Sequence, residues 1–541
     1  FSDRGPGLGL SASYGGGFVT DPSHQPWNYE GDFRGYFVYD KGTDTSYGRL
    51  PVKPDGTGST PRGYALFQDQ HFFPDNWTAQ VRLGYDSDPT FLEEWQPRQF
   101  YENGPVDVSA YLKRQQDTEA FTLLVEAQPN RLITTSDMMT NQFEVEQLPQ
   151  VAYHREGDSA LNNSVTLFSD NSAGGLEFQP TRATLAQQGF QPPNIPLGSP
   201  SLGQTGITTS PTWRADFRQE VDWPINAGHF KFVPYLVGRF TEYSQSPAGG
   251  GDQARLFGGA GARITTAFWK VDPTAESEIF DIHQLRHVIE PELNLFASGT
   301  TVDRSRLYQY NPTVDGINDI SAVDVALRQR WQTQRGGPGR WRSVDVFALD
   351  LDAEFYANKP DPKLFSPPFN SRGTIVNPYD FRGIYYTSLP ETSVPRNAFN
   401  ANAAWRISDT TVVLGDAQYN IDHSKLATAA VGVLMIRESQ QSWYIGNRYI
   451  ADLNSNISSV VMTYQISPKY TIEVGQDFDF GLGQNVGTNV SILRYFDRFI
   501  MVISFSHQQI GNQTGVDFAL IPIGLGNIGV SSAAARGPFQ R

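Results

Sequence analysis

Apolar and polar residues alternate along most of the chain, most clearly in residues 456–524. Within residues 469–480, aromatic and aliphatic side chains occupy one set of alternate positions, and the other set carries Lys469, Thr471, Glu473, Asp477 and Asp479. Successive side chains of a strand point to opposite faces. A charged face does not enter a dry core unpaired. The pattern therefore predicts a sheet with an apolar environment on one side and water on the other.

The same alternation recurs upstream in residues 29–40, 77–85, 106–114 and 229–241. Roughly two dozen such runs follow one another, each about 10 residues long with a turn or loop between. The prediction is an all-β fold, a large transmembrane antiparallel β-barrel of roughly 24–26 strands. It spans residues 1–529, with 530–541 as a C-terminal tail. No stretch has a convincing helical pattern, since the best candidate, residues 281–288, is short and runs into Glu290-Pro291.

Connections between the runs are of two kinds. Tight turns are predicted at Asn171-Ser172, Ser467-Pro468 and Phe496-Asp497, and long polar segments occupy residues 41–61, 179–210, 299–318 and 359–395. Short turns on one rim and long loops on the other are typical of a membrane barrel. Two alternatives are linkers between small domains and a soluble β-sandwich. Aromatic apolar positions, many at run ends, and charges on the opposite face favour the membrane barrel over both.

Composition narrows the function classes. Cysteine is absent, which excludes disulfides, thiolate metal sites and a cysteine nucleophile. The net charge of −15 argues against nucleic acid as a partner. No apolar run is long enough for a transmembrane helix. The sequence starts at Phe1 with neither a Met nor a signal peptide, so we expect a processed or truncated form.

No constellation of residues predicts catalysis. His283 and His287 are spaced as zinc ligands on a helix, with Glu290 close behind. Their surroundings alternate like a strand, where four residues span about 13 Å, too far for one ion. The glycines at 481, 483 and 487 predict a hairpin turn, and no G-x-S-x-G elbow is present. We therefore predict no catalytic residue, no metal site, no cofactor and no enzymatic activity.

Four prolines interrupt otherwise regular runs: Pro149, Pro234, Pro291 and Pro522. Proline donates no ladder hydrogen bond, so each marks a strand start, a bulge or a weakened edge. Pro522 lies in the last run, residues 516–523. If the first and last strands meet there, it weakens their seam.

Sequence segments that include these prolines also resemble those of a known protein family. The chain resembles the barrel domain of LptD, the lipopolysaccharide-assembly protein of Gram-negative outer membranes. The matching phrases keep the family's order along nearly the whole chain: Arg62-Gly63, His71, Asp75-Asn76-Trp77, residues 87–92 (SDPTFL), 143–151 (FEVEQLPQV), 286–293 (RHVIEPEL), 416–419 with 430–449, and 518–529 (FALIPIGLGNIG).

The resemblance implies a barrel of about 26 strands that inserts lipopolysaccharide into the outer leaflet through a seam between its first and last strands. It also implies an LptE-like lipoprotein plug in the lumen, and an LptA-like periplasmic bridge that delivers lipid to an N-terminal jellyroll. From this resemblance we expect the jellyroll to lie outside the given chain and the family's first strands to be missing or diverged, and without cysteine no disulfide can form. The lateral-gate candidates lie on the last run: Val516, Phe518, Leu520 and Pro522.

Two other function classes stay open. A large porin for soluble solutes would close with a full ladder between its terminal strands, whereas a lipid gate would have few bonds there. An outer-membrane lipase or protease would need a Ser or Asp with a His partner. Basic residues for lipid phosphates are not concentrated in the sequence, and an acidic lumen facing an acidic lipid would call for divalent cations, for which no site is evident.

Overall fold

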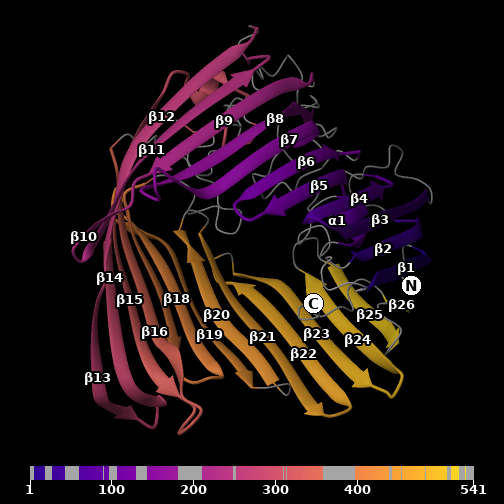
Figure 1. Cartoon of the computed structure of the whole chain (residues 1–541). Coiled ribbons are helices and arrows are strands. Elements are labelled where there is room, and N and C mark those ends of the chain that lie inside the picture. The colour runs from indigo at the N-terminus through magenta and orange to yellow at the C-terminus, as the bar shows by residue number, and fades with distance from the viewer. Residues whose placement is uncertain are drawn as a thin grey trace.

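The alternating runs become antiparallel strands, and the strands form one sheet that curls until its last strand lies beside its first (Figure 1). The structure is a computed structural model. It describes residues 5–18, 27–42, 60–88, 91–96, 106–129, 143–180, 210–247, 251–308, 310–311, 313–317, 319–357, 396–437, 441–451, 454–481, 483–508, 513–522 and 530–531. The predicted all-β barrel is confirmed.

The strands are β1 (Gly7–Phe18), β2 (Trp27–Asp40), β3 (Thr60–Phe73), β4 (Trp77–Asp86), β5 (Val108–Gln116), β6 (Glu119–Ala127), β7 (Phe143–Ala160), β8 (Val165–Pro180), β9 (Thr212–Asp222), β10 (Ile225–Ala227), β11 (Phe230–Tyr243), β12 (Gln253–Thr266), β13 (Phe268–Ser277), β14 (Ile282–Thr300), β15 (Ile320–Arg335), β16 (Arg342–Tyr356), β17 (Ala398–Arg406), β18 (Thr411–Asn420), β19 (Lys425–Arg437), β20 (Gln441–Ile450), β21 (Ser455–Ser467), β22 (Tyr470–Asp479), β23 (Gln484–Tyr495), β24 (Phe499–Gln508), β25 (Gln513–Pro522) and β26 (Val530–Ser531). A helix, α1 (Phe91–Trp95), and a 3-10 turn, η3 (Arg304–Arg306), lie in two of the connections.

Hairpin follows hairpin around the wall, with two interruptions. β9 and β10 both pair with β11, and β12 and β13 both pair with β14. Each of these pairs is one wall strand cut in two, so the wall has two strand positions fewer than the 26 strands of the sheet. This agrees with the prediction of roughly 24–26 strands. Strand β26 begins just past residue 529, where the sequence placed the end of the barrel.

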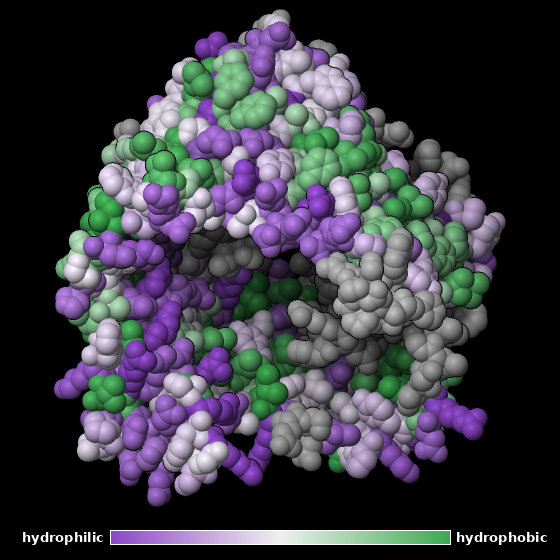
Figure 2. Space-filling model, viewed as in Figure 1, coloured by the Kyte–Doolittle hydropathy of each residue, from purple (hydrophilic) through white to green (hydrophobic). Residues whose placement is uncertain are grey.

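The two faces of the wall differ as the alternation predicts. On β9 the outward positions Trp213, Phe217 and Val221 are exposed, while the inward Asp216 and Glu220 are buried. The outer face is therefore apolar and the lumen polar. Figure 2 shows the molecule hollowed in the middle of the pictured face, with mostly hydrophilic side chains around the hollow.

The two rims also differ as predicted. One rim carries connections of two to eight residues, and the other carries every connection of nine residues or more. The predicted turns at 467–468 and 496–497 are confirmed, but the turn predicted at Asn171-Ser172 is wrong. Those residues lie inside β8, where ladders to both β7 and β9 outweigh the low strand propensity of the local sequence. Most residues of the long segments 41–61, 179–210 and 359–395 lie outside the described residues.

Three prolines lie where a ladder is disturbed. Pro149 falls in a bulge of β7, between the paired residues Gln147 and Gln150. Pro234 of β11 lies opposite the break between β9 and β10, and Pro291 of β14 lies opposite the break between β12 and β13. Proline has no N–H to give to the neighbouring strand, so the neighbour separates there. At each of the three positions the ladder to one neighbouring strand is interrupted.

The sequence predicted no helix, and α1 corrects this. It is a single turn in the loop after β4, and it packs Phe91 and Leu92 against Tyr64 and Leu66 on the lumenal face of β3. A single turn is too short to show helical periodicity in the sequence. No helix among the described residues is long and apolar enough to cross a membrane.

Candidate functional site: the strand seam and the lumen

The seam is the place where β26 lies against β1. β1 pairs with β2 along its whole length, from Gly7 opposite Val38 to Phe18 opposite Trp27. On its other edge no backbone ladder joins β1 to β25 or β26 within the described part of the chain. β25 in turn pairs fully with β24, and at Ala519 and Leu520 with β26. Among the described residues the ladder is thus continuous around the wall except at the seam.

The predicted gate residues lie on the outer face of β25. The side chains of Val516, Phe518 and Leu520 are 74%, 55% and 40% exposed, so they face lipid. β26 stands between this strand and β1 at the level of Leu520. Pro522 is the last residue of β25, opposite Phe499.

Small residues line the lumenal side of the seam. The inward positions of β1 are Gly7, Gly9, Ser11, Ser13 and Gly15, which alternate with the exposed Leu8 and Leu10. These inward residues place no bulky side chain of β1 toward the lumen at the seam. Nearer the short-turn rim, Leu493, Val502 and Ala519 form a buried apolar cluster that joins β23, β24 and β25.

Inside the barrel, the β14–β15 loop (residues 301–319) folds onto the lumenal faces of β9, β11 and β12. The fully buried carboxylate of Asp315 accepts hydrogen bonds from Arg214 Nη1 at 2.9 and 3.0 Å and from the Tyr243 hydroxyl at 2.6 Å. The loop is turned by Asn311, whose carbonyl accepts the Asp315 N–H at 2.7 Å. A buried pair of this kind costs several kcal/mol to break, because removing one partner leaves the other charge uncompensated.

Two more arginines hold the same loop. Arg239 donates to both oxygens of Asp216 and, at 3.0 Å, to the carbonyl of Thr313. Arg255 is buried and donates to the carbonyl of Val314 at 2.6 Å. These carbonyls belong to an irregular loop, so the guanidinium groups satisfy backbone acceptors that would otherwise be buried unpaired.

An aromatic cluster completes the attachment of the loop. The ring of Tyr310 stacks on Phe178 at 4.2 Å between ring centroids. The Tyr310 hydroxyl donates to Thr212 Oγ1 at 2.7 Å. Burial raises the pKa of the Tyr310 hydroxyl well above its ordinary value.

The sequence showed no concentration of basic residues, yet the fold gathers five arginines on the lumenal faces of β9, β11 and β12. Each faces an acidic partner or a loop carbonyl, as when Arg263 binds Asp222 at 2.9 Å and Glu220 at 3.1 Å. The five are Arg214, Arg218, Arg239, Arg255 and Arg263. The cluster is therefore largely neutralised.

The lumenal wall of β14–β16 is acidic. Its inward carboxylates outnumber Arg328 and Arg330, and they include Glu292, Asp324, Asp350, Asp352 and Glu354. Among the described residues no group of three or more His, Cys, Asp or Glu side chains is arranged to hold a metal ion. The acidic part of the lumen expected from the sequence thus lies on β14–β16, and no cation site is assigned to it.

His283 and His287 lie on strand β14, as the alternation predicted. Their rings stack on Trp341 at 4.4 Å and on Trp331 at 4.2 Å between ring centroids. His287 Nε2 also contacts Gln329 Oε1 at 3.1 Å. Each imidazole therefore stacks on a different indole ring.

The short-turn rim is tied together by Arg335, whose side chain is 1% exposed. It donates to carbonyls of two other turns, those of Phe280 and Asp281 after β13 and those of Arg406 and Ile407 after β17. This fixes the turn ends of β13–β18 as one unit.

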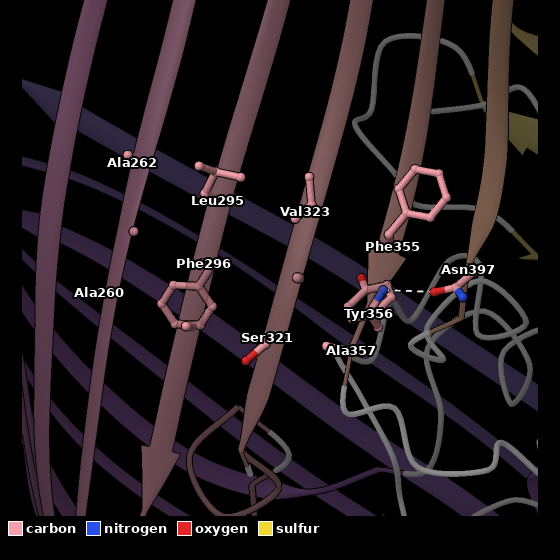
Figure 3. Close-up of a pocket in the computed structure, with 13 residues that line it drawn as sticks. Ala260, Ala262, Leu295, Phe296, Ser321, Val323, Phe355, Tyr356, Ala357 and Asn397 are labelled. Carbon is pink, nitrogen blue, oxygen red and sulfur yellow. Dashed lines mark hydrogen bonds between the residues drawn. The ribbon is translucent and has the colours of Figure 1, made fainter.

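A shallow groove of about 590 Å³ crosses the wall from β12 to β16 (Figure 3). Leu295, Val323 and Phe355 form its bulky side, on three neighbouring strands, and small residues such as Ala260 and Ser321 form the other. Its lining is mostly apolar and offers no convergent polar groups. We regard it as a feature of the outer wall rather than a binding site.

An apolar outer face around a polar lumen, with short turns on one rim and long loops on the other, is the architecture of bacterial outer-membrane proteins. The chain is an outer-membrane β-barrel. The short-turn rim of such a barrel faces the periplasm and the long-loop rim faces outward. Barrels with a wide polar lumen are channels and transporters.

No protein-family model and no curated protein matches the sequence significantly. Among solved structures, the chain is similar at 9% identity to the siderophore receptor PirA from Pseudomonas aeruginosa, with a TM-score of 0.32 over 96% of this chain and 79% of that chain. The FrpB iron transporter from Neisseria meningitidis gives 9% identity and a TM-score of 0.33 over 93% and 77%. A Rhodopseudomonas blastica porin triple mutant gives 10% and 0.18 over 56% and 93%.

Sequence reasoning missed the loop attachment. Its one local signal is β9, where Arg214, Asp216, Arg218, Glu220 and Asp222 occupy every second position. That pattern identifies a polar face. It carries no information that Asp315, about a hundred residues away, completes the network.

Proposed function

We propose that this barrel is a translocon that inserts lipopolysaccharide into the outer leaflet of the outer membrane through the seam between β1 and the last strands. The observation that carries the proposal is the edge of β1 away from β2, along which no backbone ladder is found among the described residues. Every other strand boundary in the described wall is held by a ladder, and this one is not. Opening a ladder in hydrocarbon exposes unsatisfied backbone groups at a cost of several kcal/mol each, so an exit for lipid is cheapest where few bonds exist.

The chemistry on the two sides of the seam suits an amphiphile. Outside, Leu8, Leu10 and Phe518 present an apolar surface to acyl chains. Inside, the lumen is lined by charged and amide side chains that can form hydrogen bonds with sugars. Between them, Ser11 and Ser13 and the glycines of β1 offer little side-chain obstruction. A soluble solute needs the lumen alone, whereas a lipid with a large sugar headgroup needs both.

The resemblance to the LptD barrel supports the same proposal and adds partners. On that basis an LptE-like lipoprotein occupies the lumen, and an LptA-like bridge delivers the lipid from the periplasm through a jellyroll domain. In this proposal the protein is not an enzyme. It moves lipid through the shape of its lumen and through a wall whose first and last strands can separate.

One observation favours the alternative of a channel for soluble solutes. The β14–β15 loop is fixed inside the lumen by buried ion pairs, and it narrows the long-loop end without closing the seam. A fixed loop of this kind sets the size limit of a passage. It acts on solutes that cross the lumen and has no role in lateral release.

Depletion of the protein from cells that depend on it separates the two functions. The proposal expects newly made lipopolysaccharide to stop reaching the surface, as measured with a membrane-impermeant label, while uptake of a small hydrophilic solute stays unchanged. The converse result, unchanged surface lipopolysaccharide with reduced solute uptake, would overturn the proposal and favour the channel.

A further inference from the structure

The edge strand β1 is packed closely against β2 on its paired side. Its glycines leave spaces on both faces, and tyrosines of β2 fill two of them. A Cβ at Gly16 would lie 2.6 Å from the Tyr29 hydroxyl oxygen, and a Cβ at Gly7 would lie 2.8 Å from Tyr36 Cζ. Tyr29 covers Gly16 on the outer face, and Tyr36 covers Gly7 on the lumenal face.

The third contact runs in the opposite direction. Tyr14 of β1 lies across Gly31 of β2, where a Cβ would come within 2.7 Å of Tyr14 Cε1. The ring then reaches β3, where it stacks on Phe67 with 6.5 Å between centroids, and its hydroxyl donates to Asp69. One side chain thus ties β1 to β3 across the strand between them.

Asp69 gives this contact its strength. Its neighbours in register, Gly31 on β2 and Val81 on β4, place it on the outer face of the barrel. A carboxylate on the lipid-facing surface is costly unless it is paired. Asp69 is 14% exposed, and His71 Nε2 approaches it at 2.9 Å while Tyr14 supplies the hydroxyl. Pulling β1 away from β2 would remove the Tyr14 donor.

The lumenal contact is anchored in turn by the long-loop rim. The ring of Tyr36 lies 6.4 Å from that of Phe91 and 6.2 Å from that of Trp95, both on α1. Helix α1 is fixed by Arg62, which binds Asp40 at 2.8 Å and Asp88 at 2.7 Å. The loop after β4 therefore braces β2 at the level where β2 covers the first residues of β1.

We propose that β1 is the immobile lip of the seam, held by the contacts of Tyr14, Tyr29 and Tyr36 with the glycines between β1 and β2, and that opening is made by β25 and β26. This inference rests on the proposed lateral release and names the residues that decide which side of the seam moves. Among the described residues, no tyrosine ring covers a glycine between β24 and β25, and the outer level of β25 is joined to β24 by its ladder and by the hydrogen bond between His507 Nδ1 and Thr514 Oγ1 at 2.8 Å. Val516 and Phe518 are highly exposed there. β26 pairs with β25 at two described residues only.

Because the chain lacks cysteine, each lip can be locked separately by an engineered disulfide. Ala12→Cys with Phe33→Cys joins β1 to β2, and Met501→Cys with Leu520→Cys joins β24 to β25, at residues directly opposite in register. Directly opposed antiparallel residues lie within the Cα separation that a disulfide spans. The readout is delivery of lipopolysaccharide to the cell surface in oxidised and reduced cells.

The expected result is that the β1–β2 lock leaves delivery within about twofold of the unmodified chain, while the β24–β25 lock lowers it roughly tenfold or more and reduction restores it. A block by the β1–β2 lock would overturn the inference, because β1 would then have to move. Unchanged delivery with both locks closed would instead count against lateral release itself. The two failures are therefore distinguishable.

A second measurement tests the tyrosine contacts directly. In Tyr14→Ala the β1 amides within residues 8–14 that donate to β2 should exchange hydrogen roughly tenfold faster than in the unmodified barrel. In Tyr14→Phe, which keeps the ring, their exchange rate should lie between the two. Tyr153→Ala is the matched control, because Tyr153 is an outward tyrosine that donates to Glu119 at 2.9 Å away from the seam. Heat-modifiable gel migration should first show that both variants are folded. Equal rates of amide hydrogen exchange in β1 of Tyr14→Ala and Tyr153→Ala would then refute the anchoring role.

Discussion

The attachment of the β14–β15 loop is the most sharply testable feature of the lumen, and Asp315→Asn is the substitution that isolates it. Asparagine keeps the shape of the side chain but removes the charge that Arg214 and Tyr243 both use. The side chains of Arg214 and Asp315 are 4% and 0% exposed, so solvent cannot replace the lost partner. Breaking a buried pair from one side costs about 3–5 kcal/mol. Because the amide oxygen of asparagine can still accept a hydrogen bond, we expect a cost near the lower end, about 3 kcal/mol.

The cost should be local, because the loop is attached to a wall of continuous ladders that does not depend on it. About 3 kcal/mol raises the population of the detached loop roughly 100-fold. The amides of Val314 and Asp315, which donate to Asn311 at 3.1 and 2.7 Å, report this opening by hydrogen exchange. We expect their exchange to accelerate by that factor while exchange in β11 is unchanged.

Asp345→Asn is the matched control, because Asp345 is exposed and accepts one hydrogen bond from Gln332 at 2.9 Å. It should leave the loop unaffected. If Asp315→Asn accelerates loop exchange by only about threefold, the value of one neutral hydrogen bond, then the buried charge does not hold the loop and the reasoning fails.

Three further outcomes follow from burial. Burial raises the pKa of the Tyr310 hydroxyl above 10.0, so the contribution of this group to stability is complete below about pH 10 and is lost as the pH rises through the raised pKa. A difference absorbance titration against Tyr310→Phe should show one phenol ionising well above pH 10. A midpoint near pH 10 would contradict this. Arg335→Met should lower the free energy of unfolding by about 3 kcal/mol in urea titrations, whereas the exposed Arg342→Met should change it by less than about 1. Leu66→Ala, in the buried cluster under α1, should cost about 2–5 kcal/mol, against about 0.5 or less for the exposed Leu161→Ala; equal losses would show that α1 does not seal this cluster.

The alternation was sufficient to predict the barrel because a strand has only two faces. Once Trp213 and Phe217 are known to alternate with Asp216 and Glu220, one face must meet an apolar environment and the other water, and the aromatic character of the apolar face favours lipid. The effect of the prolines could also be predicted from the sequence, since a missing N–H disturbs the ladder wherever the residue lies. The turn at Asn171-Ser172 failed for the opposite reason, because ladders on both sides overrode the local preference.

What the sequence by itself determined about this protein is therefore what depends on near neighbours: the strands, their two faces, the rims and the places where ladders weaken. Only the tertiary structure decided which distant groups meet. Asp315 and Arg214 are about a hundred residues apart, and Tyr14 reaches Asp69 only because β2 carries Gly31 between them. Such contacts follow from barrel closure and strand register, which set side chains opposite one another without leaving a repeat in the sequence.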